Sequence, residues 1–217
     1  MGEADVEERA EQDELARLLG VELSEVARFA AQLMERTGAY TVLCPGCGGG
    51  ECSAFFARRG FRVTAFDMSQ QTPRRVTRSA ELLGVRVEAF SDDIISPRRE
   101  LRHFDAIFSH NALHQMRPSQ RRALLRNFHR ALRPGGILVV SVLSIEDERY
   151  GYGREIEEDT FDSGSGDSIH FYSAPELHGE LGEFFEVTQI EEMEETHMTF
   201  GGKQRYRLLV ATAVKMD

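Results

Sequence analysis

The residues most able to do chemistry lie between positions 41 and 67, where a glycine-rich turn is followed by an acidic residue. A short apolar run leads into Gly46, Gly48 and Gly50, and then come a helical segment, a second apolar run and Asp67. This order is typical of a βαβ unit, in which amides of the first turn and a carboxylate after the second strand face one ligand. The stretch therefore predicts a site for a nucleotide-like cofactor.

The glycines and the aspartate have complementary roles in such a site. Glycine has no Cβ, so Gly46, Gly48 and Gly50 allow backbone amides to approach a bound molecule closely. Asp67 offers two acceptor oxygens to a ribose diol. A second interpretation of Asp67, as the N-cap of the following helix, stays open.

The same turn carries thiols that suggest a different chemistry. Cys44 and Cys47 form a CxxC pair, and His110 and His114 follow a later strand. Cysteine and histidine are ligands of tetrahedral zinc, and CxxC pairs also occur in redox sites. A metal would fill the turn that the glycines leave open, so we expect none. With Cys52 the cysteines number three within nine positions, which argues against a disulfide framework.

Apolar patterns predict strands and helices in alternation. Residues 13–37 have helical periodicity, in two pieces around Gly20, with Ser24 as a cap for the second piece and Gly38 at its end. Strands are predicted at residues 41–44, 62–67, 86–93, 104–110 and 137–143, and helices at residues 50–60, 70–84, 118–133 and 174–185. Two last strands, residues 186–200 and 204–214, are joined by Gly201 and Gly202 and predict a hairpin.

This alternation predicts an α/β fold, a Rossmann-like, doubly wound sheet of seven strands with a C-terminal antiparallel hairpin. Residues 1–39 are predicted to be an N-terminal helical extension, and residues 40–217 one domain. Residues 144–173 interrupt the pattern, because they are rich in glycine, serine and acidic residues with aromatic residues between them. Long loops inside compact domains are often functional, so we expect this segment to be a substrate lid.

Composition and charge indicate where the protein acts and which partners it is expected to have. Its 217 residues carry a formal net charge of −10, with 41% hydrophobic and 29% charged residues. No apolar stretch approaches the roughly 18 residues of a membrane helix, and nothing at the N-terminus indicates export, so we expect a cytoplasmic protein. The negative charge makes nucleic acid an unlikely partner, although arginines gather between residues 74 and 133. The oligomeric state stays open.

Five features in sequence order carry a resemblance to a known family. They are GCGGG at residues 46–50, Asp67 after VTAF, the pair Asp93 and Ile94, FDAIFS at residues 104–109 and LRPGGILVVS at residues 132–141. Together with the closing hairpin, they resemble class I S-adenosylmethionine-dependent methyltransferases over residues 40–214. The tail from residue 168 resembles the tellurite-resistance type, whose members methylate small soft nucleophiles. The PGCG form of the turn is similar to that of thiopurine and halide methyltransferases.

The resemblance implies S-adenosyl-L-methionine as methyl donor and S-adenosyl-L-homocysteine as product. It implies that Asp93 accepts from the adenine amino group, with neighbouring Asp92 as an alternative, while Ile94 lends its amide to the ring edge. The chain departs from the class at Cys44, where an acid is usual, so contacts to the methionine amino group are expected to pass to water or to Ser109. The expected cofactor-binding residues are Cys44, Gly46, Cys47, Gly48, Gly50, Asp67, Met68, Asp93, Ile94, Ser109 and His110.

The remaining polar residues are candidates for contact with the methyl acceptor. His110 and His114 follow a strand at the edge where open α/β sheets bind ligands, so either is a candidate general base or a structural histidine. The resemblance places His197 near the acceptor, and we take His114 and His197 as the predicted catalytic residues. Candidate substrate-binding residues are Tyr152, His170, Tyr172 and Arg205.

The leading hypothesis is methyl transfer to a small-molecule nucleophile by in-line displacement. Two alternatives remain: a catalytically silent, cofactor-binding regulatory or interaction protein, and a methyltransferase that acts on protein or RNA. The nature of the acceptor is open, because the aromatic and acidic segment 144–173 suits a cation whereas the resemblance of the tail suggests a soft anion.

Overall fold

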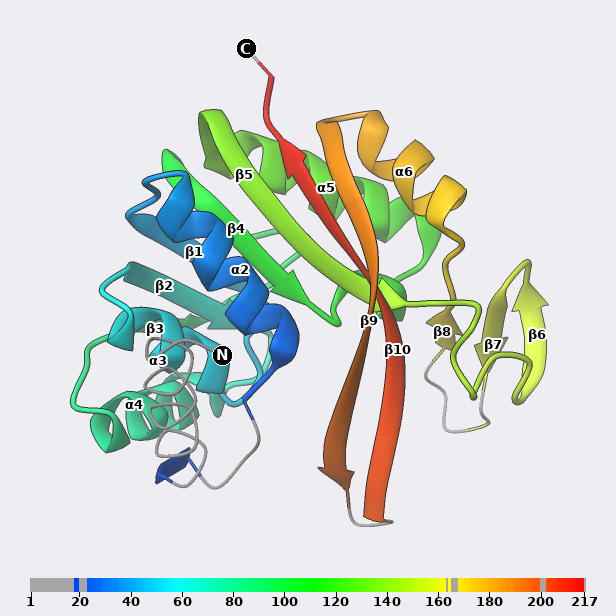
Figure 1. The fold of residues 1–217 in the computed structure, drawn as a ribbon, viewed down its shortest axis with the longest axis horizontal. Helices are drawn as coiled ribbons and strands as arrows, with labels where there is room; N and C mark the ends of the chain where they lie inside the picture. Colours follow the sequence, from blue (N-terminus) through cyan, green and yellow to red (C-terminus); the bar gives the residue numbers. More distant parts are fainter. Residues whose placement is uncertain (1–17, 20–22, 163, 165–167, 200–201, 217) are drawn as a thin grey trace, which may run out of the picture.

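A seven-stranded mixed sheet organises the protein (Figure 1), and the computed structural model describes residues 18–19, 23–162, 164, 168–199 and 202–216. The strands are β1 (Thr41–Pro45), β2 (Arg62–Asp67), β3 (Glu88–Ser91), β4 (Phe104–His110), β5 (Leu132–Leu143), β9 (Glu186–Thr199) and β10 (Gly202–Val214). Their order is β3-β2-β1-β4-β5-β10-β9, with β10 antiparallel to both of its neighbours and all other pairs parallel. The predicted Rossmann-like sheet with an antiparallel C-terminal hairpin is confirmed.

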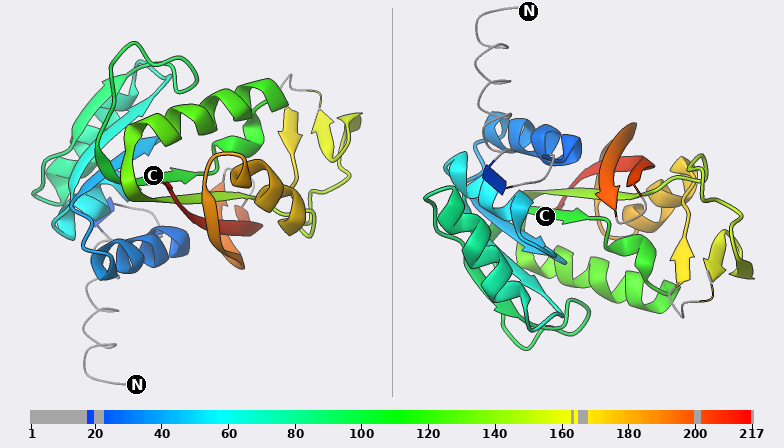
Figure 2. Two further views of the ribbon diagram at one scale, coloured as in Figure 1. Left: turned by 90° about the horizontal axis from the view of Figure 1, so that it is seen from above. Right: turned by 90° about the horizontal axis from the view of Figure 1, so that it is seen from below.

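Helices cover both faces of this sheet, as the two views in Figure 2 show. Apolar residues of α2 (Glu25–Arg36), α3 (Glu51–Arg58) and α4 (Thr72–Leu82) join one buried cluster. Those of α5 (Pro118–Ala131) and α6 (Ala174–Gly182) join a second cluster on the opposite face. The central strands are therefore buried on both sides, which explains the continuous apolar runs in their sequences.

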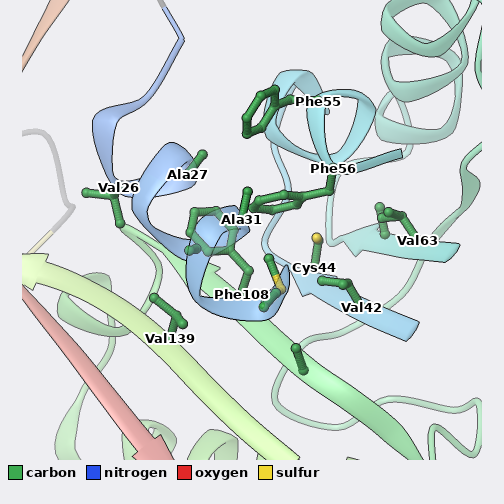
Figure 3. Close-up of a cluster of buried hydrophobic side chains, with 14 of the residues drawn as sticks. Val26, Ala27, Ala31, Val42, Cys44, Phe55, Phe56, Val63, Phe108 and Val139 are labelled. Atoms are coloured by element: carbon green, nitrogen blue, oxygen red, sulfur yellow. The ribbon is translucent and has the colours of Figure 1, made fainter. Parts of the chain in front are cut away.

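Helix α2 is the second piece of the predicted N-terminal helix, and the first piece lies mostly outside the described residues. It begins where Ser24 Oγ accepts a hydrogen bond from the Ala27 amide at 3.0 Å, and it is followed by Gly38 with a φ of 70°. Both predicted ends are confirmed. Figure 3 shows Val26, Ala27 and Ala31 of this helix in the cluster with strand residues. The helix is therefore part of the main core.

Two strands differ in length from the sequence prediction. β5 begins at Leu132 instead of residue 137, because Leu132 pairs with Phe104 of β4 and the amide of Gly135 bonds to the carbonyl of Lys215 at 2.9 Å. β3 ends at Ser91. Asp92, which was predicted to lie within that strand, instead accepts hydrogen bonds in the turn that follows it.

The predicted lid, residues 144–173, contains its own antiparallel sheet. Its strands are β6 (Arg154–Glu157), β7 (Thr160–Asp162) and β8 (Ser168–His170), with β7 in the middle. The base of the segment is tied to the main fold, since the Tyr172 amide bonds to the Leu143 carbonyl at 2.8 Å. The segment therefore has ordered secondary structure where a loop was expected.

The aromatic packing beneath α2 leads to a prediction about stability. Phe56 is fully buried, and its ring meets those of Phe55, Phe61 and Phe108. Phe56→Ala should lower the free energy of unfolding by about 3–5 kcal/mol, because it leaves a cavity in this cluster. Leu82→Ala, at a side chain that is 46% exposed, should change it by less than about 1 kcal/mol. Urea denaturation measures both, and equal losses would contradict this account of the core.

Candidate active site

A cleft opens where the carboxyl ends of β1, β2 and β4 meet, the edge at which open α/β sheets bind ligands. It has a volume of about 450 Å³. Its lining residues are Gly46, Gly48, Asp67, Met68, Ile94, Ile95, His110, Asn111, Ala112, Gln115, Met116 and Gln120. Six of the eleven expected cofactor-binding residues are thus brought together: Gly46, Gly48, Asp67, Met68, Ile94 and His110.

The three glycines of the turn serve different purposes. Gly46 and Gly48 have φ values of 69° and 54°, and both line the cleft. A Cβ on Gly48 would meet no protein atom within 4 Å, so the space beside it belongs to the cleft. A Cβ on Gly50 would lie 2.8 Å from Val76 Cα of α4. Gly50 is therefore required for close packing of the turn against α4.

Asp67 is held at the end of β2 with its carboxylate in the cleft. Oδ1 accepts from the Ser69 amide at 2.9 Å, and Oδ2 accepts from the Gly48 amide at 3.2 Å. A carboxylate has about four acceptor positions, so two remain for a ligand such as a ribose diol. The carboxylate both shapes the glycine turn and faces the cleft.

The two acidic residues after β3, Asp92 and Asp93, have different hydrogen-bond partners. Asp92 is buried and holds the backbone of Arg98 and Arg99 through Oδ2, at 3.0 and 3.3 Å. Asp93 is exposed, and its Oδ1 accepts from the amides of Ile95 and Ser96. Ile94 projects into the cleft, whereas the carboxylate of Asp93 is not part of the lining.

The cysteines in and beside the turn pack against the core, with Cys44 buried and Cys47 and Cys52 half-buried. Cys44 is buried in the cluster with Phe56 and Val42, as Figure 3 shows. All three cysteines are free thiols, and burial, followed by the charge of Asp67, raises the pKa of Cys47 to about 12. Thiols with raised pKa values are poor nucleophiles, which disfavours redox chemistry. Nor do the described residues gather three or more metal-ligating side chains, so the zinc alternative has no support.

A second cavity of about 570 Å³ adjoins the cleft, and we call it the acceptor cavity. Its lining residues are Asn111, His114, Gln115, Arg117, Gln120, Leu143, Arg149, Ser168, Ile169 and Tyr206. It shares Asn111, Gln115 and Gln120 with the cleft, so these residues separate two neighbouring spaces. They lie in or beside the short helix η1 (Leu113–Gln115) and the start of α5.

His114 lines the acceptor cavity in the neutral form. It is 5% exposed, and its Nδ1 accepts from the Leu143 amide at 3.3 Å. Burial, followed by the positive charge of Arg149, lowers its pKa to about 3. An imidazole with this pKa is a weak base at neutral pH. Because Nδ1 is an acceptor here, the proton resides on Nε2, and His114 faces the cavity as a hydrogen-bond donor.

His110 connects the cleft to the outermost strand of the sheet. Its Nδ1 lies 2.7 Å from Ser141 Oγ, and its Nε2 lies 3.3 Å from Glu195 Oε2 of β9. The buried Glu195 also accepts from Ser24 Oγ at 2.6 Å and from the Val26 amide at 3.0 Å. The N-terminus of α2 thus stabilises a carboxylate that positions His110.

Ser109 lies just before His110 and is fully buried, with no hydrogen-bond partner for its hydroxyl in the described part of the chain. It does not line the cleft.

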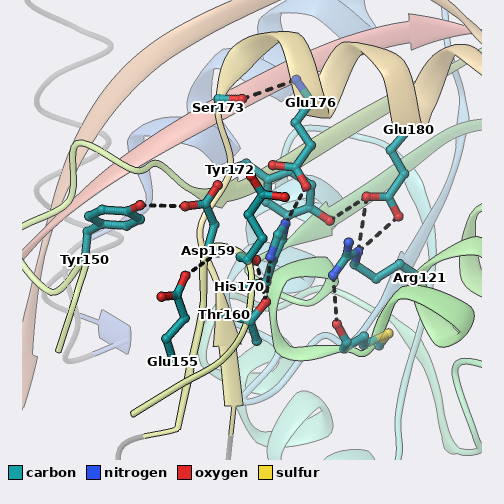
Figure 4. Close-up of polar contacts among 12 residues, drawn as sticks. Arg121, Tyr150, Glu155, Asp159, Thr160, His170, Tyr172, Ser173, Glu176 and Glu180 are labelled. Atoms are coloured by element: carbon teal, nitrogen blue, oxygen red, sulfur yellow. Dashed lines mark hydrogen bonds and ion pairs between the residues drawn. The ribbon is translucent and has the colours of Figure 1, made fainter. Parts of the chain in front are cut away.

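Two expected substrate residues of segment 144–173, His170 and Tyr172, have partners within the protein (Figure 4). His170 lies between Thr160 Oγ1, at 2.9 Å, and Glu176 Oε1, at 2.8 Å. Tyr172 is fully buried and donates to Glu180 Oε2 at 2.9 Å. These contacts fasten the segment to α6, and neither side chain lines the acceptor cavity.

The other predicted contacts lie outside both cavities or cannot be described. Tyr152 is 78% exposed, and Arg205 pairs with Glu194 on the surface of the hairpin at 3.9 Å. His197 occupies β9 opposite Gln204, but its side chain lies outside the described residues.

Sequence reasoning missed several lining residues that the fold brings together. Asn111 has a φ of 56°, an uncommon value for a residue other than glycine, and its position directly after β4 was the available signal. Arg117, Arg149 and Tyr206 come from three separate elements, so no local pattern indicated that they share a cavity. Nothing in the sequence distinguished Glu195 from the other acidic residues of β9.

Comparison with known proteins identifies the class. Residues 42–136 match a family model described as a methyltransferase domain. This match covers less than half of the chain; the strand order and the cleft agree with it and indicate an S-adenosylmethionine-dependent methyltransferase domain. None of the described helices is long and apolar enough to cross a membrane.

Three of the similar proteins illustrate these matches. A ubiquinone biosynthesis O-methyltransferase of Coxiella burnetii is 29% identical over 139 residues, which are 63% of this chain and 58% of that protein. The 1,6-didemethyltoxoflavin-N1-methyltransferase of Burkholderia thailandensis, solved with S-adenosylhomocysteine and 1,6-didemethyltoxoflavin bound, is 26% identical, with a TM-score of 0.68, over 89% of this chain and 79% of that one. TehB from Haemophilus influenzae is 15% identical, with a TM-score of 0.67, over 89% of this chain and 63% of that one.

These similarities support the class and leave the subgroup open. The aligned regions span 42% to 58% of the length of the curated relatives that the chain matches. The similarity to TehB shows a common fold, and the subgroup suggested by the tail of the sequence is not established.

The neutral state of His114 predicts how stability depends on pH. The unfolded chain protonates this residue near pH 6.5 and the folded protein only near pH 3, so the free energy of unfolding falls as pH drops through this window. Between pH 7 and pH 5 the free energy of unfolding should fall by about 2 kcal/mol more in the wild-type protein than in His114→Gln. The glutamine side-chain oxygen preserves an acceptor for the Leu143 amide. Urea denaturation at the two pH values measures this, and parallel losses in both proteins would contradict it.

The buried Glu195 gives a second prediction. Glu195→Ala leaves Ser24 and the Val26 amide without their acceptor and should reduce stability by about 1–3 kcal/mol. Glu195→Gln retains an acceptor oxygen and should lose less. Glu192→Ala, at an exposed position on the same strand, is the matched control. Denaturation midpoints test the order of the three variants, and an unchanged midpoint for Glu195→Ala would refute the role of Glu195 in holding α2.

Proposed function

We propose that the protein transfers the methyl group of S-adenosylmethionine to a small-molecule nucleophile bound in the acceptor cavity. The observation that carries this proposal is the shared wall of Asn111, Gln115 and Gln120 between the cleft and the acceptor cavity. A methyltransferase needs two adjoining spaces, one for the donor and one for the acceptor, so that the reacting atoms align for in-line displacement.

The residues of the cleft suit the donor. Gly48 leaves room that a side chain would fill, and Asp67 retains free acceptor positions beside it. Ile94 and Met68 provide apolar surface for a ring. When bound, S-adenosylmethionine supplies an electrophilic methyl group on a positively charged sulfur.

The chain itself has to orient the acceptor and exclude water. The acceptor atom donates a lone pair to the methyl carbon while the carbon–sulfur bond breaks and sulfur keeps its electrons. An anionic acceptor gives up no proton in this step, whereas a neutral one must release a proton. Positioning and desolvation supply much of the rate acceleration in such a reaction.

The relatives and the size of the cavity favour a small acceptor. The names of the O-methyltransferase from C. burnetii and the N1-methyltransferase from B. thailandensis refer to small organic molecules. A volume of about 570 Å³ suits a ligand of that size better than a protein or RNA segment. We expect the protein to act in the cytoplasm.

Binding and turnover separate this function from its alternatives. The protein is incubated with S-adenosylmethionine carrying a labelled methyl group and with phenols, carboxylates, thiols, amines, halides, selenite or tellurite. Transfer of label to a small molecule supports the proposal. Binding of the donor without transfer to any acceptor would instead indicate a silent regulatory protein, and label found in added RNA or protein would indicate a macromolecular substrate.

Asp67 provides a sharper test of the donor site. Asp67→Asn preserves an acceptor for the Ser69 amide but removes the charge and one acceptor oxygen. It should weaken binding of S-adenosylhomocysteine about tenfold to a hundredfold, since hydrogen bonds to charged groups contribute about 1.5–3 kcal/mol. Glu81→Gln, an exposed position on α4, makes the same chemical change outside the cleft and should bind normally. Calorimetry measures both, and unchanged affinity in Asp67→Asn would remove Asp67 from the site.

A further inference from the structure

The lining of the acceptor cavity is rich in hydrogen-bond donors. Arg117 and Arg149 contribute guanidinium groups, and Asn111, Gln115 and Gln120 contribute side-chain amides, of which those of Asn111 and Gln115 each also contact a protein acceptor. Among the described residues that line the cavity there is no aspartate or glutamate. We propose that this cavity binds a planar organic anion, a carboxylate- or phenolate-bearing acceptor, with its negative group against Arg117 and Arg149. This inference rests on the proposed function and names the class of its acceptor.

Arg149 is positioned in advance by a buried carboxylate. Its Nε and Nη2 donate to Asp147 at 2.7 and 3.0 Å, and the Asp147 side chain is fully buried behind it. Asp147 also accepts from the Arg207 amide at 2.8 Å, so its oxygens are satisfied within the protein. In the part of the chain that the structure describes, Nη1 of Arg149 has no hydrogen-bond partner. That nitrogen can donate to a ligand without rearrangement of the side chain.

Arg117 adds a cation that the protein does not neutralise. It lies at the start of α5, is exposed, and has no ion pair among the described residues. The Arg149–Asp147 pair is close to neutral as a unit, so Arg117 gives the cavity its net positive charge. Together the two arginines provide one fixed donor and one mobile charge.

The neutral His114 adds a third donor of fixed direction. Its Nδ1 is occupied by the Leu143 amide, which leaves Nε2–H for the cavity. A group that stays uncharged at neutral pH and presents N–H suits an oxygen anion and offers little basicity to a neutral hydroxyl or amine. His110 lines the cleft and is not part of the lining of the acceptor cavity. The reaction balances without a base if the acceptor is already an anion.

Size and apolar walls indicate an organic anion instead of an inorganic one. Leu143 and Ile169 form apolar surface, and the ring of Tyr206 lies 4.1 Å from the Arg149 guanidinium carbon. A cavity of about 570 Å³ is large for an oxyanion such as tellurite but suits a ligand with one or two rings. Arg149, Ser168 and Ile169 all belong to segment 144–173, which thus forms one wall of the cavity.

Three ligands of one shape and different charge test the inference. We choose 6-hydroxy-2-naphthoate, its primary amide and the corresponding aminomethyl compound, each titrated into the full-length protein with and without saturating S-adenosylhomocysteine. The carboxylate should bind at least about tenfold more tightly than the amide, because its contacts to arginine are charge-assisted. The amine should bind most weakly.

Variants assign this preference to particular residues. Arg117→Gln should remove most of the difference in affinity between the carboxylate and the amide. Arg126→Gln makes an equal change of charge at an exposed position on α5 and should preserve that difference. Arg149→Lys maintains the charge beside Asp147, so the fold should survive. It should weaken binding of the carboxylate ligand and leave binding of the other two ligands unchanged. Thermal denaturation checks that each variant is folded.

Several results would overturn the inference. They are equal affinity for the three ligands, preference for the amine, binding of tellurite without binding of the carboxylate, no binding of any ligand at millimolar concentration, or equal behaviour of Arg117→Gln and Arg126→Gln. Failure of S-adenosylhomocysteine to bind would contradict the proposed function separately, since the carboxylate titration without it still measures the preference of the cavity.

Discussion

Burial of the central strands on both faces is the constraint that organises the rest of the structure. Residues Val42, Ala106 and Val139 of β1, β4 and β5 are completely buried, and helices cover the sheet on either side. A strand enclosed in this way carries mostly apolar side chains along its length. Polar side chains therefore gather at its carboxyl end, where Asp67, His110 and the glycine turn meet in the cleft.

A carboxylate on the outermost strand links this edge to the N-terminal helix. Glu195 contacts His110 on one side and Ser24 and Val26 on the other. A buried charge is tolerated only when it is well partnered, and here a helix N-terminus and a histidine supply the partners. The position of His110 in the cleft therefore depends on docking of α2, although α2 contributes no residue to the lining.

The sequence predicted the sheet and the donor side of the site better than the acceptor side, and there is a physical reason. Gly46, Gly48 and Asp67 belong to one βαβ unit, so their spacing along the chain already determines their proximity. The acceptor cavity combines Arg117 of α5, Arg149 of segment 144–173 and Tyr206 of β10, whose contacts depend on tertiary packing. Gly50 has a role that the sequence did not indicate, since its missing side chain allows the turn to pack against α4. Contact of Asp93 with adenine stays a prediction; its Oδ1 accepts from two amides of its own turn.

The chemistry of the acceptor follows from which groups the protein has already satisfied. Segment 144–173 is acidic in sequence, which suggested a cationic acceptor, but none of its described carboxylates lines the cavity, and two have partners in the protein: Asp147 accepts from Arg149, and Asp159 accepts from Tyr150 at 2.5 Å. Of these residues only Arg149, the donor of its pair, lines the cavity. Burial meanwhile keeps His114 neutral, so the cavity has donors for an anion but no strong base to create one. This arrangement suits an acceptor that arrives already charged, because an anion can attack an electrophilic methyl group without any proton transfer.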